Sequence, residues 1–93
     1  MTDSNTIPRK LDGADVLLFA KTDGTGFTQC GEERWTIVAV AIAQYSGSEK
    51  IYVFSLDRDY EVIGDVDCNS VTDAMELVLT WHGVKEHEWL RVA

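Results

Sequence analysis

The sequence has few cysteines, few cations, a single proline and no long apolar run. Its two cysteines, Cys30 and Cys68, are too few for the disulfide framework that a small secreted domain usually needs, and two reduced thiols fit a cytoplasmic protein better. The first residues are polar and lack the apolar segment of a signal peptide. The longest apolar run, residues 37–43, is far shorter than a membrane span. We therefore expect a soluble, cytoplasmic protein.

Charge is the strongest signal in the composition. Sixteen Asp and Glu residues oppose eight Lys and Arg residues, so the formal net charge is −8. A field of this sign repels phosphates and anionic membranes, which argues against direct binding to nucleic acid or to a membrane. It favours basic partners, such as a nucleic-acid-handling protein, a basic peptide or a cation. Solubility alone is the competing explanation of the same surplus.

Length and residue pattern predict one α+β domain. Residues 1–13, which are polar and include Pro8, are predicted to form a flexible N-terminal arm ahead of a single domain at residues 14–93. A run of apolar residues at almost every position, 35–45, is typical of a central strand covered on both faces. The expected strands are residues 16–21, 35–45, 51–56, 60–66 and 86–92, with residues 27–33 as a loop or a return strand. The three middle strands are predicted to form an antiparallel meander.

After residue 66 the apolar period changes from that of a strand to that of a helix. One helical face would carry Val71, Ala74, Met75, Val78, Leu79 and His82. Ser70 is placed to cap the first turn, and Gly83 to end the helix in a left-handed conformation. The predicted fold is therefore α+β: a mainly antiparallel sheet of roughly four to five strands with one helix, residues 71–82, on one face, in the order β(β)βββαβ. The opposite sheet face is expected to be partly solvated or used for a partner.

Residues 65–76 carry oxygen side chains at a spacing that resembles the calcium loop of EF-hand proteins. The would-be ligands are Asp65, Asp67, Asn69, Asp73 and Glu76. Clustered carboxylates repel one another, and a hard cation relieves that repulsion. However, Ser70 stands where the sharp turn needs glycine, and the preceding segment has a strand pattern rather than a helix pattern. A small calcium-binding module is therefore an alternative function, and we assign no metal ligands.

The histidines and cysteines do not have the spacing of a catalytic site. Cys68 precedes the predicted helix, and a helix N-terminus can lower a thiol pKa. His82 lies at the opposite end of that helix, about 18 Å away, which is too far for a nucleophile and its base. His87 stays open as a base, and with His82 it would form a metal pair without an evident third ligand. We expect no enzymatic activity and no cofactor.

The candidate partner-binding residues are Asp57, Asp59, Glu61, Asp65, Asp67 and Trp81. Carboxylates gathered on one face would meet a Lys/Arg patch or imitate a row of phosphates, but a bulge at Gly64 would decide whether they share a face. Trp81 falls off the apolar helix face, either as a boundary residue covering the sheet edge or as an interface anchor.

These features favour a small protein-binding inhibitor that engages a basic partner through a negatively charged surface. An immunity protein, an antitoxin and a phage-type anti-CRISPR-like inhibitor all have this character. Its target would be a basic protein, for example one that handles nucleic acid. A homodimeric structural or accessory protein, self-associating through a sheet edge or a Trp-bearing face, is the other alternative.

Overall fold

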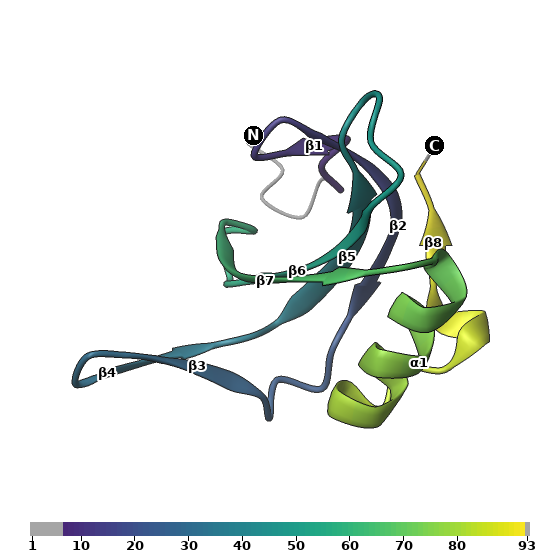
Figure 1. Ribbon diagram of the computed structural model, residues 1–93. Helices are drawn as coiled ribbons and strands as arrows, with labels where there is room; N and C mark the ends of the chain where they lie inside the picture. Colours follow the sequence, from purple (N-terminus) through teal and green to yellow (C-terminus); the bar gives the residue numbers. More distant parts are fainter. Residues whose placement is uncertain (1–6, 93) are drawn as a thin grey trace, which may run out of the picture.

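The computed structural model describes residues 7–92, the side chain of Cys30 excepted. Figure 1 shows the arrangement of its elements. In chain order they are β1 (Lys10–Leu11), β2 (Ala14–Lys21), β3 (Phe27–Cys30), β4 (Glu33–Thr36), β5 (Ala39–Gln44), β6 (Ile51–Leu56), β7 (Val62–Cys68), α1 (Val71–His82), the 3-10 helix η1 (Glu86–Glu88) and β8 (Leu90–Arg91). Neither helix of this part of the chain is long and apolar enough to cross a membrane.

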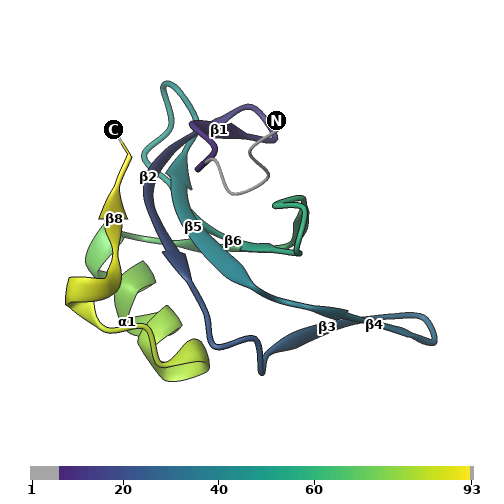
Figure 2. The ribbon, with the colours of Figure 1, turned by 180° about the vertical axis from the view of Figure 1, so that it is seen from behind.

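The main sheet is antiparallel and strongly curled. Its strand order is β1-β2-β5-β6-β7, and β8 pairs with β2. The pairing of β5 with β6 and of β6 with β7 confirms the predicted meander. Register shifts mark two bulges, which bend strands and increase their twist: the extra residue is Leu17 in β2 and Ile63 in β7. The sheet therefore curls around an inner face, with α1 on the outer face (Figures 1 and 2).

Each face of the sheet has its own hydrophobic core. On the outer face Val40, Ile42 and Val53 pack with Ala74 and Val78 of α1. The inner face buries a second cluster, which includes Val16, Phe19, Ala41, Phe54 and Leu56. Full burial of one such large side chain contributes about 1.5–3 kcal/mol. The curl therefore buries inner-face side chains of β2, β5 and β6, so the expectation that the second face is partly solvated or used for a partner does not hold there. At β7 the same face is partly solvated, because Asp65 and Asp67 are exposed.

The helix forms as the sequence predicts. α1 spans Val71–His82, and Ser70 caps it, with its hydroxyl accepting a hydrogen bond from the Asp73 backbone N–H. Gly83 ends it at a φ of 69°, and its N–H donates to the Leu79 carbonyl. One expected core residue differs, because Leu79 is half-exposed. Together with the curled sheet, this confirms the predicted α+β class with one helix on one face.

The predicted strand at residues 35–45 is divided in two. β5 is buried from Ala39 to Ala43 and lies centrally in the sheet, as expected. The earlier part is β4, which pairs with β3 as a separate hairpin and is exposed throughout. This β3–β4 hairpin projects away from the rest of the molecule in both views (Figures 1 and 2). Most residues of its two strands are polar, which suits a two-stranded ribbon in solvent rather than a buried strand.

Both ends of the chain differ from the sequence prediction. Residues 1–6 of the predicted arm lie outside the described residues, but β1 pairs with β2, and Ile7 and Leu11 pack on the inner core. The folded domain therefore begins before residue 14. The predicted strand at residues 86–92 instead begins with η1 (Glu86–Glu88), and its only strand part is the short β8 (Leu90–Arg91). The Glu88 carboxylate accepts a hydrogen bond from the Lys85 N–H, and this favours a helical turn there.

Candidate functional site

The turn between β6 and β7 gathers three carboxylates. The side chain of Asp57 accepts hydrogen bonds from the N–H groups of Asp59 and Glu61, each 2.9 Å long. Tyr60 adopts a φ of 60°, and its ring packs edge-on against Phe19 of the inner core, 5.1 Å between centroids. A left-handed backbone is unfavourable for tyrosine, and this burial offsets the cost. The hydrogen bonds to Asp57 and the packing of Tyr60 on Phe19 therefore hold the turn in one conformation.

The fixed turn places oxygen atoms of Asp57, Asp59 and Glu61 within 4.8 Å of one another. Such oxygens are the ligands that hard divalent cations prefer. Asp57 already uses one oxygen to accept two backbone hydrogen bonds, and Asp59 and Glu61 are exposed. The cluster is explained by the turn itself, so its proximity alone does not indicate a metal centre.

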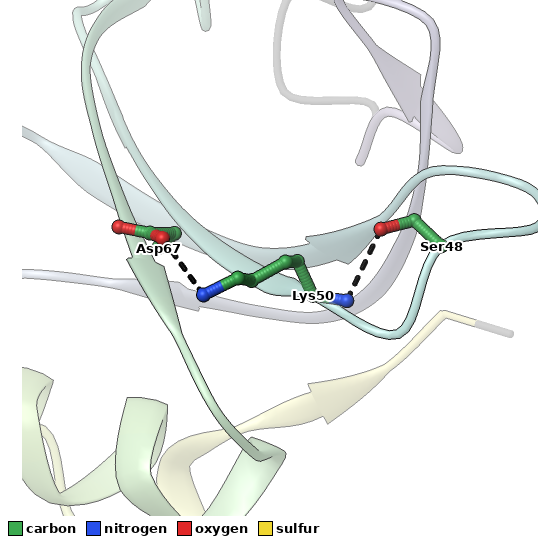
Figure 3. Close-up of polar contacts among 3 residues, drawn as sticks. All are labelled: Ser48, Lys50 and Asp67. Atoms are coloured by element: carbon green, nitrogen blue, oxygen red, sulfur yellow. Dashed lines mark hydrogen bonds and ion pairs between the residues drawn. The ribbon is translucent and has the colours of Figure 1, made fainter.

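β7 carries two further carboxylates on one face. Asp65 pairs in register with Phe54, and Asp67 pairs with Tyr52, so both aspartates project on the side of the inner core. Both side chains are exposed. The Lys50 ammonium lies 3.2 Å from an Asp67 oxygen, as Figure 3 shows, in a pair whose side chains are 53% and 56% exposed. Such exposed pairs are worth about 1 kcal/mol or less, and salt screens them further.

We call these five carboxylates the acidic edge: Asp57, Asp59, Glu61, Asp65 and Asp67. They lie on β7, which is the last strand of the sheet, and on the turn that leads into it. The cations adjoining them in sequence or by ion pairing are Arg58 and Lys50. Whether a bulge occurs at Gly64 is left open by the sequence, and the structure has one directly before it, at Ile63, since Leu56 pairs with Val62 and Ser55 with Gly64. It lies before Asp65, and it therefore leaves Asp65 and Asp67 on the same face.

A hollow of about 720 Å³ separates the β3–β4 hairpin from this turn. We call it the turn hollow. Its lining carries the carboxylates of Glu33, Asp57, Asp59 and Glu61, the guanidinium groups of Arg34 and Arg58, and Trp35. The Arg34 guanidinium lies 4.2 Å from the centroid of the Phe27 ring and so is already engaged within the hairpin.

A second hollow, of about 450 Å³, lies on the helix side of β7. We call it the helix hollow. Trp81, which is 54% exposed, and Phe27, which is 47% exposed, line it from α1 and from the hairpin. Gly64, Asp65 and Val66 of β7 form its other side. Trp81 therefore lies beside the middle of β7, at the edge of the sheet. About half of its surface stays exposed there.

His82 anchors the base of the hairpin against the end of α1. A Cβ atom added to Gly26 would lie 2.7 Å from His82 Cε1, so the backbone of Gly26 packs directly on the imidazole. The Nδ1 atom of His82 is buried without a hydrogen-bond partner in the described structure. Burial lowers the pKa of His82 below its ordinary value, and the negative charge of Asp23 opposes part of that shift. Neutral imidazole is therefore the form that this contact favours.

The predicted calcium loop at residues 65–76 does not form. Asp65 and Asp67 lie on an extended strand, Ser70 caps a helix, and Asp73 and Glu76 lie on that helix. A calcium loop needs these oxygens to converge on one point, and a strand followed by a regular helix spreads them apart. The backbone of residues 65–76 therefore lacks the loop geometry on which the calcium alternative was based.

Cys68 has the environment of a structural thiol. It is half-buried, and burial, followed by the charges of Asp73 and Asp67, raises its pKa. The thiolate is the nucleophilic form, so these carboxylates oppose the effect of the helix N-terminus. The helix of 12 residues separates Cys68 from His82.

Sequence reasoning missed the helix hollow and the contact that shapes it. The sequence predicts a loop or a return strand at residues 27–33, so nothing in it connects Phe27 or the preceding Gly26 with the end of α1. The signal in the sequence is an aromatic residue directly after a glycine, which marks a close backbone approach beside an exposed ring. The partner of that approach, His82, is distant in sequence and follows only from the tertiary fold.

Comparison with known proteins gives the chain no relative. Neither a protein-family model, nor a curated protein, nor a solved structure matches it. Any functional conclusion therefore depends on the residues and geometry of this chain.

Proposed function

We propose that this protein is a cytoplasmic protein-binding inhibitor whose acidic edge docks onto a basic, nucleic-acid-handling protein. The observation that supports the proposal is the grouping of Asp57, Asp59, Glu61, Asp65 and Asp67 on one terminal strand and the turn before it. The five carboxylates outnumber the two adjoining cations, Arg58 and Lys50, so the local potential stays negative although Lys50 pairs with Asp67. The overall charge of −8 has the same sign and would steer a basic partner toward the molecule.

The spacing of the carboxylates suits a partner that binds nucleic acid. Alternate residues of a strand, such as Asp65 and Asp67, are about 7 Å apart and project to the same side. A row of negative charges at regular intervals presents to a basic surface the kind of field that a phosphate backbone presents. Occupying that surface would exclude the nucleic acid, and this is the inhibition that we propose.

Binding fits the chemistry of the chain better than catalysis. The Cys68 thiol is kept protonated by burial and by its acidic neighbours, and it lies at the opposite end of α1 from His82. A nucleophile needs a base within hydrogen-bond reach, about 2.6–3.2 Å. The exposed carboxylates, by contrast, are free to meet a partner's cations.

A charge-matched pair of variants tests the proposal. The edge variant carries Asp59→Asn, Glu61→Gln and Asp65→Asn, and it keeps Asp57 because that side chain holds the turn. The control variant carries Glu49→Gln, Glu76→Gln and Glu86→Gln, three exposed carboxylates away from the edge. Both have the same net charge. Each protein is tagged and used to capture partners from a lysate of the source organism at low and at high salt.

We expect the wild type and the control variant to retain the same basic protein at low salt, and the edge variant to bind it about tenfold more weakly. Addition of the wild-type protein should then inhibit nucleic-acid binding by the purified partner. Equal capture by the edge variant would overturn the role of the acidic edge. Recovery of no basic protein, or capture that salt does not affect, would overturn the proposed function itself.

A further inference from the structure

The outer edge of β7 is open. β7 pairs with β6 on one side, and no strand within residues 7–92 pairs with its other side. It is seven residues long, whereas β1, at the other end of the sheet order, has two. A free strand edge presents unpaired N–H and C=O groups, which are a template for a further strand. Peptide recognition by strand addition uses such an edge.

The two faces of β7 would offer different surroundings to an added strand. On the inner face the exposed carboxylates of Asp65 and Asp67 stand on alternate residues. On the outer face Gly64 and Val66 border the helix hollow, where Trp81 is 54% exposed, and the rim of this hollow also includes Asp65. Successive side chains of an added strand alternate between these faces. Every second residue would meet carboxylates, and the residues between them would meet the hollow.

We propose that β7 binds a strand of the partner in which lysine or arginine residues alternate with apolar residues. This inference rests on the proposed function, and it adds the mode of recognition and the sequence pattern of the segment recognised. The basic side chains would pair with Asp65 and replace Lys50 at Asp67, and the apolar side chains would enter the helix hollow against Trp81. Backbone hydrogen bonds supply affinity, and the alternating side chains supply specificity.

A second copy of this chain is a poorer occupant of the same edge. Two-fold antiparallel pairing of β7 with itself, centred on Asp65, would place the two Asp65 side chains opposite each other. Centring the pair on Val66 would place Asp65 opposite Asp67 of the copy. Like charges directly opposite across two strands are destabilising. Charge complementarity therefore favours a basic segment over self-association.

Two synthetic peptides of equal composition provide the probes. Both match β7 in length, seven residues. One alternates lysine and valine, beginning and ending with lysine, and the other has all lysines before all valines. Titration calorimetry at low salt measures their affinity for the full chain, and amide hydrogen exchange measures protection of residues 62–68. Two single variants are titrated in parallel: Trp81→Ala, and Leu79→Ala as the control, since Leu79 is also half-exposed on α1 but does not line the hollow.

We expect the alternating peptide to bind about tenfold more tightly than the block peptide and to slow exchange along β7. Trp81→Ala should weaken its binding about tenfold, and Leu79→Ala should leave it unchanged. Equal binding of the two peptides, without protection of β7, would overturn strand addition while leaving a charged docking surface intact. If neither peptide binds, the acidic edge itself does not attract cations, and the proposed function falls as well. Light scattering that shows a dimer sealed through β7 would also overturn the inference.

Discussion

β5 and the β3–β4 hairpin are joined directly in the chain but are stabilised in different ways. Ala39 to Ala43 are fully buried between two cores, and every residue of β4 is exposed. The hairpin is held instead by its own strand pairing, by the Arg34 guanidinium over the Phe27 ring, and by the contact of Gly26 with His82 at its base. A two-stranded hairpin alone is marginally stable in water, so this base contact matters for its position.

The two regions use their aromatic residues differently: those of the sheet are buried in the core, and those of the hairpin stay exposed and can contact a partner. Phe54 is 1% exposed, and Trp35 is 39% exposed. Trp35 lines the turn hollow and Phe27 the helix hollow, and both hollows border β7 or the turn before it. Exposed aromatic residues beside a charged surface are typical of protein interfaces. The hairpin thus contributes surface to the acidic edge while the curled sheet supplies the stability.

The largest expected effect comes from replacing one aromatic residue of each region with alanine. We expect Phe54→Ala to lower the free energy of unfolding by about 3–5 kcal/mol, because it leaves a cavity in the inner core. Trp35→Ala should cost about 1 kcal/mol or less, because its ring is already partly in solvent. Urea denaturation followed by circular dichroism measures both. A cost for Trp35→Ala as large as that for Phe54→Ala would show that the hairpin shares the core's stability.

The joint between the two regions is tested by a pair of glycine substitutions. Gly26→Ala would place its methyl group 2.7 Å from His82 Cε1, and we expect a loss of about 1–3 kcal/mol as the ring or the hairpin shifts. Gly64→Ala is the control, since its methyl group would meet Thr28 Oγ1 at an ordinary 3.7 Å. We expect that control to be neutral or to stabilise by less than about 1 kcal/mol. The same denaturation experiment compares them, and equal effects would contradict the tight contact at Gly26.

Elements with strong local signals were predictable from the sequence. α1 has the predicted bounds because Ser70, Gly83 and the helical period act within a few residues of one another. β6 also has its predicted bounds, and the meander follows from short turns that leave adjacent strands little choice of partner. The acidic residues were identified as a sequence run, and the single bulge before Asp65 decides that two of them share a face.

The features that depend on distant contacts were not predictable. An apolar run such as residues 35–45 fits a strand buried on both faces, and only the tertiary fold places Trp35 beyond the end of the sheet. The curl that closes the inner core involves bulges in β2 and β7, and these have no periodic signature. The helix hollow requires Phe27 to meet Trp81 across the fold. These contacts shape the candidate site, so its hollows were missed while its charges were found.

Acidification should weaken the contact between His82 and Gly26, with a smaller effect on stability than the Gly26→Ala substitution. Burial lowers the pKa of His82 below its ordinary 6.5 in the folded protein, so just below that pH the unfolded chain holds more protons. Stability should therefore fall as the pH drops through about 6.5 toward the lower folded pKa, and Asp23 limits the fall by attracting the imidazolium. His82→Gln should lose this dependence, and His87→Gln, which alters an exposed histidine, should keep it. Urea midpoints at about pH 7.5 and 5.5 measure the difference. If wild type and His82→Gln lose the same stability between these two pH values, protonation of His82 does not destabilise the fold. The neutral imidazole would then not be the form that the contact with Gly26 favours.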